Sequence, residues 1–195
     1  MRPAATRRAG PARETKLLAD PALAVSRAGE FEGYASLFGT PDLGGDVVLP
    51  GAFRDSLARR GPAGIRMLWQ HDPAEPLGRW IALSEDARGL RVRGRLNANV
   101  ARAREIAALM AEGGVDGLSI GFRVVEADRD RASGHRRLRR VDLWEISVVT
   151  FPMLPGARVS APPPAPTQSL ALAIRRAAIR LSHPAGLPAL TMRTR

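Results

Sequence analysis

The chain lacks cysteine altogether and contains only three histidines. The absence of cysteine excludes disulfide cross-links, cysteine nucleophiles and metal sites built from thiolates. The histidines, which are His71, His135 and His183, are not spaced as a pair of zinc ligands. The sequence therefore argues against metal catalysis, and we expect neither a metal nor another cofactor.

Long apolar runs are also missing. No stretch approaches the roughly 20 consecutive apolar residues that a membrane-spanning helix needs. Arg7 and Arg8 are followed by no apolar segment, which argues against a secretory or twin-arginine signal. We expect a soluble cytoplasmic protein that makes no contact with a membrane.

Acidic residues are scarce at the two ends of the chain. The net charge is +11, but residues 161–195 carry five arginines and no acid, and residues 1–30 carry six basic and three acidic groups. The middle, 31–160, is nearly balanced, with 19 basic and 16 acidic groups. Nucleic-acid binding is therefore expected through the basic ends if anywhere, and not through the middle of the chain.

The composition also divides the chain into three parts. Residues 1–30 are rich in Ala, Arg and Pro and predict a mobile basic arm. Residues 31–160 contain the periodic segments and predict one folded domain. Residues 161–195 predict a Pro-rich linker followed by a basic amphipathic tail, with a short helix over 170–181.

The predicted domain is a β-rich α+β fold. Residues 90–96 alternate apolar side chains with Arg91, Arg93 and Arg95, the period of a half-buried strand. Similar patterns predict strands over 31–38, 47–49, 65–70, 77–84, 117–126 and 138–151, and helices over 52–60 and 100–112. Many short strands with two helices predict a closed or nearly closed β-barrel flanked by helices.

Ser119 is the candidate nucleophile. A serine hydroxyl attacks only when a neighbouring base removes its proton and the approach is open. Gly117 and Gly121 keep the approach open, and they also allow backbone N–H groups to turn toward an oxyanion. The alternative is an ordinary strand serine beside a bulge glycine.

His71 is the candidate general base, because histidine titrates near neutral pH. It follows an apolar strand at a point where the chain turns. The alternative is a surface histidine bonded to Asp72. His135 lies among arginines in a loop and His183 lies beyond the Pro-rich linker, so both are weaker candidates.

Glu145 is the candidate for the acidic group that orients the histidine. A carboxylate among apolar residues is costly to bury unless it is paired, so it could orient a histidine. The alternative is a solvent-facing side chain on the strand face shared with Leu143 and Ser147. Asp142 and Asp72 are the reserve candidates for this role.

Seven short motifs in order resemble the caudoviral prohead (procapsid) maturation protease family. They are Gly33-Tyr34-Ala35-Ser36, Asp42 to Asp46, Pro50-Gly51-Ala52-Phe53, Trp69-Gln70-His71-Asp72, Pro76-Leu77-Gly78, Gly117 to Phe122, and Trp144-Glu145-Ile146-Ser147 before Phe151-Pro152. The resemblance covers about 31–159. It departs at Met153-Leu154-Pro155-Gly156, where an Asn-containing turn would be expected.

The resemblance implies a fold similar to the herpesvirus assembly protease and a catalytic triad in the chain order His71, Ser119, Glu145. It implies a serine endopeptidase that removes the scaffolding segment of the major capsid protein inside the assembling procapsid and also digests itself. Whether the chain forms a homo-oligomer is left open. The rival hypothesis is a non-enzymatic nucleic-acid-binding or head-structural protein, suggested by the basic ends.

Overall fold

The computed structural model describes residues 25, 26 and 28–160. Most of the predicted N-terminal arm, the Pro-rich linker and the predicted helix over 170–181 lie outside the described residues, so the predicted division into three parts remains a prediction. The described strands are β1 (Glu30–Leu37), β2 (Asp46–Val48), β3 (Arg66–Trp69), β4 (Asp72–Glu85), β5 (Gly89–Leu96), β6 (Gly117–Arg129), β7 (Arg136–Val149) and β8 (Val159–Ser160). The helices are α1 (Arg54–Arg60), a 3₁₀ turn (Pro62–Gly64) and α2 (Ala101–Ala111).

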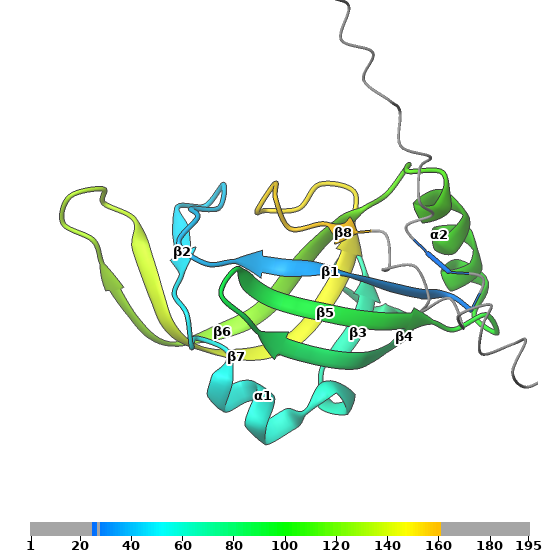
Figure 1. Ribbon diagram of the computed structural model, residues 1–195, viewed down its shortest axis with the longest axis horizontal. Coiled ribbons are helices and arrows are strands. Elements are labelled where there is room, and N and C mark those ends of the chain that lie inside the picture. Colours follow the sequence, from blue (N-terminus) through cyan, green and yellow to red (C-terminus); the bar gives the residue numbers. More distant parts are fainter. Residues whose placement is uncertain (1–24, 27, 161–195) are drawn as a thin grey trace, which may run out of the picture. The chain divides into compact units, whose positions relative to one another are not determined.

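All eight strands form one sheet in the order β2-β7-β3-β4-β5-β1-β8, and β6 pairs with β7. The strand β7 is central to the site, because β6 lies antiparallel along one edge while β3 and β2 lie parallel along the other. The three strands β6, β7 and β3 therefore run side by side, and residues far apart in the sequence meet across them (Figure 1).

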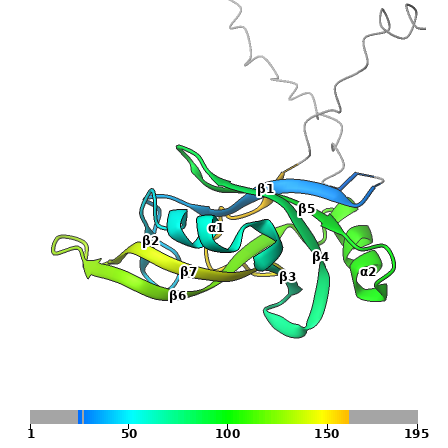
Figure 2. The same cartoon turned by 90° about the horizontal axis from the view of Figure 1, so that it is seen from below.

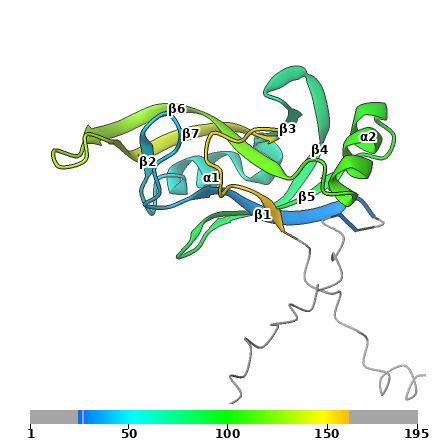
Figure 3. The same ribbon diagram turned by 90° about the horizontal axis from the view of Figure 1, so that it is seen from above.

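The sheet curls strongly but does not close (Figures 2 and 3). Between β6 and the segment leading into β8, one isolated bridge joins Gly117 to Arg158 in the described residues. The β-rich fold with two flanking helices is thus confirmed, and the barrel is open. The two-residue strand β8, which pairs with β1, carries too short a pattern to be predicted from sequence.

The interior of the curl is filled by the apolar rows of the strands. Alternation places Ile146 and Val148 of β7 inward, where both are fully buried. Met67 of β3 and Leu118 of β6 join them in the same core. The helix α1 packs against β7 and β4, and α2 packs against β4 and β5 (Figure 1). The opposite face of β3, β6 and β7 carries the polar candidates.

Candidate active site

His71 and Glu145 are brought into direct contact, although 74 positions separate them in the chain. His71 Nδ1 lies 2.6 Å from Glu145 Oε1. Glu145 belongs to β7, and β3 runs parallel to it from Arg66, beside Glu145, to Trp69, beside Val148. The turn after β3 then brings His71 back toward the carboxylate, with its N–H bonded to Ser147 Oγ. The His71 side chain is 42% exposed and that of Glu145 only 13%. The ion pair is therefore partly shielded from water, with the ring on the accessible side.

A left-handed turn aims the His71 ring. Gln70 and His71 have φ angles of 52° and 62°, in a region that residues other than glycine rarely adopt. Two backbone N–H groups of the turn bond to β7: Gln70 N donates to the backbone oxygen of Val148 at 3.0 Å, and His71 N donates to the side-chain Oγ of Ser147 at 3.1 Å. Backbone strain of this kind persists where the surroundings fix it, and it is frequent at functional sites.

A β-bulge in β7 places Glu145 on the site face. Gly121 of β6 lies opposite Glu145, while the next residue, Phe122, lies opposite Leu143, so Trp144 is an extra residue in β7. Such a bulge inverts the alternation of side chains. Leu143 is consequently buried in the core, and Glu145 does not share its face, contrary to the alternative considered from the sequence.

Ser119 lies on the same face as these residues. It is directly opposite Ser147 in the β6–β7 ladder. Side chains directly opposite each other project to the same side, with Cβ atoms about 5 Å apart. Since Ser147 Oγ is bonded to both Glu145 and the His71 backbone, Ser119 is the next residue beside this cluster. Within the described residues its hydroxyl makes no hydrogen bond, although the residue is only 6% exposed.

The two glycines that flank Ser119 provide space rather than unusual backbone angles. Neither Gly117 nor Gly121 has a positive φ. A Cβ at Gly121 would overlap Glu145 Oε1 and lie 2.7 Å from Glu145 Cδ, so the carboxylate lies directly over this glycine. A Cβ at Gly117 would lie 2.8 Å from Pro152 Cδ. Gly121 is needed because the Glu145 side chain crosses β6 there, and Gly117 because the Val149 backbone oxygen and the Pro152 ring lie against it.

The electrostatics of the pair favour a charged histidine. The hydrogen bond to Glu145 raises the pKa of His71 above its ordinary value of 6.5, and the charge of Glu145 acts in the same direction. Partial burial opposes this shift but is the smaller effect. An imidazole so placed accepts a proton readily near neutral pH.

The reserve candidates lie elsewhere. Asp142 is bound by Arg59 and Arg60 of α1 and accepts a hydrogen bond from Trp144 Nε1. Asp72 is exposed and accepts a hydrogen bond from Ala74 N at 2.8 Å. In the described residues, neither carboxylate forms a hydrogen bond or an ion pair with the His71 ring, so the geometry favours Glu145 for this role.

His135 is the other histidine that the structure describes, and it lies away from this cluster. His135 lies in the β6–β7 loop, where its backbone carbonyl accepts a hydrogen bond from Asp130 N. His183 lies outside the described residues.

Within residues 25, 26 and 28–160, no group of three or more acidic or histidine side chains is arranged to hold a metal ion. None of the helices described is both long and apolar enough to span a membrane.

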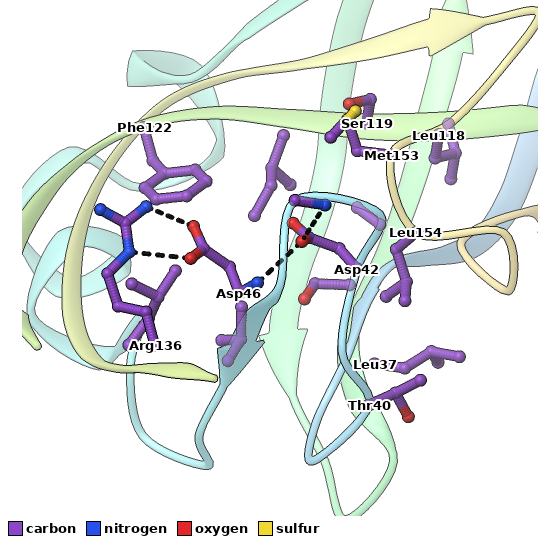
Figure 4. A pocket seen from close by; sticks show the side chains of 16 residues that line it. Leu37, Thr40, Asp42, Asp46, Leu118, Ser119, Phe122, Arg136, Met153 and Leu154 are labelled. Carbon is purple, nitrogen blue, oxygen red and sulfur yellow. Dashed lines mark hydrogen bonds and ion pairs between the residues drawn. The ribbon is translucent and has the colours of Figure 1, made fainter. Parts of the chain in front are cut away.

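A cavity of about 300 Å³ lies beside Ser119, between β6 and the loops that follow β1 and β7 (Figure 4). Its walls are largely apolar and include Leu37, Val48, Leu118, Ile120, Phe122, Leu138, Met153 and Leu154. The acidic groups at one side are already engaged: Asp46 is paired with Arg136, and Asp42 Oδ1 accepts hydrogen bonds from the backbone of Gly44 and Asp46. The cavity therefore suits an apolar group next to the Ser119 hydroxyl.

The family model for the caudovirus prohead serine protease matches residues 19–168. This chain belongs to that family. The prohead protease of Enterobacteria phage HK97 is 40% identical over 137 residues, which cover 69% of this chain and 60% of the HK97 protein. The chain thus spans less than two thirds of that relative. The resemblance inferred from the sequence motifs is confirmed, and the non-enzymatic alternative is not favoured.

A solved phage protease structure has a similar fold. The bacteriophage T4 capsid assembly protease gives a TM-score of 0.51 at 11% identity, covering 62% of this chain and 80% of that one. A Kaposi's sarcoma herpesvirus protease in complex with a hexapeptide phosphonate inhibitor gives a TM-score of 0.45 at 13% identity, covering 80% of this chain and 77% of that chain. At 11% identity, the T4 likeness shows the fold alone.

Ser147 is the site residue that sequence reasoning missed. It is fully buried, donates to Glu145 Oε2 at 2.6 Å and accepts from His71 N. The signal was present, because Glu145 and Ser147 are two residues apart and share a face of any strand. The alternation does not reveal what that face contacts, and the position was interpreted only as a neighbour of Glu145.

Proposed function

We propose that this chain is a serine endopeptidase of phage head maturation, with Ser119 as nucleophile, His71 as general base and Glu145 as the group that orients His71. The observation that carries the proposal is the 2.6 Å contact between His71 Nδ1 and Glu145 Oε1 beside the unbonded Ser119 hydroxyl. Family membership supports the serine peptidase class, and the geometry supports the assignment of roles.

The contact with Glu145 leaves one ring nitrogen for the chemistry. With Nδ1 donating to the carboxylate, Nε2 is unprotonated in neutral His71 and can accept the Ser119 proton. Ser119 Oγ then attacks the peptide carbonyl and forms the acyl-enzyme, while His71 becomes imidazolium next to the Glu145 charge. His71 returns its proton to the leaving amine, and water releases the acyl group by the same steps in reverse. The Ser119 Oγ to His71 hydrogen bond need not be formed before substrate binds, because such bonds tighten in the substrate complex.

The substrate we propose is the scaffolding segment of the major capsid protein, inside the assembling procapsid. The HK97 relative is named a prohead protease, and the T4 neighbour is named a capsid assembly protease. The apolar cavity beside Ser119 would take a side chain next to the scissile bond. Self-digestion within the particle is the second expected activity.

Co-expression with the major capsid protein from the same genome tests this function. Mass spectrometry of the capsid N-terminus should find a trimmed subunit with the wild-type protease and an untrimmed one with Ser119→Ala. Ser84→Ala is the matched control, because Ser84 is an exposed strand serine on β4, outside the cluster. Normal trimming by Ser119→Ala would refute the assignment of the nucleophile.

A further inference from the structure

Ser147 bonds both to Glu145 and to the backbone of His71. Its hydroxyl has one proton to donate, and that proton is directed to Glu145 Oε2 at 2.6 Å. The same oxygen accepts the backbone N–H of His71 at 3.1 Å. Among the described residues, no other side chain bonds to both Glu145 and the His71 backbone.

The two oxygens of Glu145 have different partners. Oε1 contacts His71 Nδ1, and Oε2 accepts the Ser147 hydroxyl. With both oxygens held, the carboxylate plane is fixed, and Oε1 stays directed at the ring. Without the Ser147 hydroxyl, the carboxylate could rotate about its terminal torsion, which is broad in glutamate.

The bond to His71 N acts on the backbone of the same pair. His71 has a φ of 62° and needs surrounding contacts to remain in that conformation. A buried N–H without a partner is unfavourable, so loss of the Ser147 oxygen would allow the turn to relax toward water. Loss of the Ser147 hydroxyl would therefore release both the Glu145 carboxylate and the turn that holds the His71 ring.

Ser147 is not itself suited to attack a substrate. It is fully buried, and its hydroxyl is occupied by two hydrogen bonds, whereas Ser119 lies directly opposite with a free hydroxyl at the cavity. We infer that Ser147 is a positioning residue, which holds the Glu145 carboxylate and the His71 turn in the geometry needed for proton transfer. This inference rests on the proposed function.

The test compares Ser147→Ala with Ser56→Ala. Ser56 is also fully buried, and its hydroxyl accepts the Leu143 N–H of β7 at 2.9 Å, so it matches Ser147 in burial and in its bond to a backbone N–H. We expect Ser147→Ala to lower kcat by about 100-fold on a peptide spanning the capsid cleavage site, with KM changed by less than about threefold, because a small misplacement of catalytic groups acts on turnover. Ser56→Ala should keep kcat within about threefold while lowering the melting temperature.

A double-mutant cycle separates positioning from a general structural effect. If Ser147 acts through the Glu145–His71 pair, Ser147→Ala should cost less than about threefold in kcat when Glu145 is already alanine. Multiplicative losses in Glu145→Ala/Ser147→Ala would overturn the inference, as would a kcat of Ser147→Ala within about threefold of wild type. If Ser147→Ala does not fold, Ser147→Cys keeps the volume with a weak donor, and a wild-type kcat there would overturn it equally.

Ser119→Ala keeps this inference distinct from the proposed function. If Ser119→Ala still turns over the peptide, the proposed function fails whatever Ser147 does. If Ser119→Ala is inactive and Ser147→Ala is normal, only the positioning role fails.

Discussion

The strand β7 carries two shielded carboxylates three positions apart, and it holds them in opposite ways. Asp142, 5% exposed, is bound by Arg59 and Arg60 from α1 and by Trp144 Nε1 at 2.9 Å. Glu145, beyond the bulge, has His71 and Ser147 as partners. One carboxylate is paired with permanent cations, and the other with a group that gains and loses its proton near neutral pH.

The different partners of the two carboxylates indicate different roles, a structural one for Asp142 and a chemical one for Glu145. Hydrogen bonds from Arg60 and Trp144 hold the pKa of Asp142 far below its usual range, so this side chain stays ionised at every pH at which the protein would work. Its contacts tie α1 to β7 on one side of the bulge. Glu145 instead faces a titratable ring beside Ser119, where its negative charge can stabilise the imidazolium that proton transfer forms. We therefore assign Asp142 to stability and Glu145 to the proposed mechanism.

The largest expected effect comes from removing each charge in turn. Glu145→Gln should lower kcat by about 10²–10⁴-fold, because the amide cannot stabilise the imidazolium and can favour the wrong tautomer of His71. Asp142→Asn should keep kcat within a few-fold. Steady-state hydrolysis of the capsid-site peptide measures both.

Stability should show the opposite ranking, with Asp142→Asn losing more than Glu145→Gln. Asp142→Asn leaves Arg59 and Arg60 without their anionic partner, so the melting temperature should fall by several degrees. The melting temperature of Glu145→Gln should fall less, because the partners of Glu145 are a partly exposed ring and a hydroxyl. Equal losses of activity in the two variants would remove the distinction between the carboxylates.

Much of the fold could be predicted from sequence because its patterns are local. Alternation over 90–96 predicted β5, observed at Gly89–Leu96, and helical spacing over 100–112 predicted α2, observed at Ala101–Ala111. The length of β4 was underestimated: its first residues, 72–76, do not resemble a strand, yet Asp72 and Pro76 pair with Trp69 and Leu68 of β3. The pairing of β7 with β3 and β2 depends on contacts distant in sequence, which no local pattern encodes.

The candidate residues of the proposed site could be chosen from the sequence, but their geometry could not. The choice of Ser119, His71 and Glu145 together came from the resemblance to a family, whereas each residue alone had an ordinary alternative. The extra residue at Trp144 could not be read from the sequence, because a bulge leaves no mark in an apolar strand. The left-handed backbone at Gln70 and His71 was not inferred either. Glutamine rarely adopts it, and although histidine is enriched there, most histidines have a negative φ.

A smaller effect is expected from the glycine under Glu145. In Gly121→Ala the new Cβ would overlap Oε1 and lie 2.8 Å from Glu145 Cγ, so the glutamate must move away from His71. We expect kcat to fall by about 10–100-fold, less than for Glu145→Gln, because the charge remains near the ring. Gly114→Ala is the control, since its nearest atom would be 3.4 Å away. A normal kcat for Gly121→Ala would mean that the carboxylate functions from another position.

The smallest expected effect is a shift in the pKa of His71, and it tests the same difference between Glu145 and Asp142. The contact with Glu145 raises the pKa of His71 above 6.5, so the neutral base forms only as pH rises through that higher value. The stabilising contribution of this pair should be complete below pH 6.5 and should be lost as pH rises through the pKa of the folded state. NMR titration of the His71 ring in a Ser119→Ala background, which prevents self-digestion, measures the midpoint directly. We expect Glu145→Gln to lower that midpoint toward 6.5, and Asp142→Asn to leave it unchanged, because Asp142 does not contact the ring. An equal shift in both variants would mean that the whole strand, rather than Glu145, sets the proton affinity of His71.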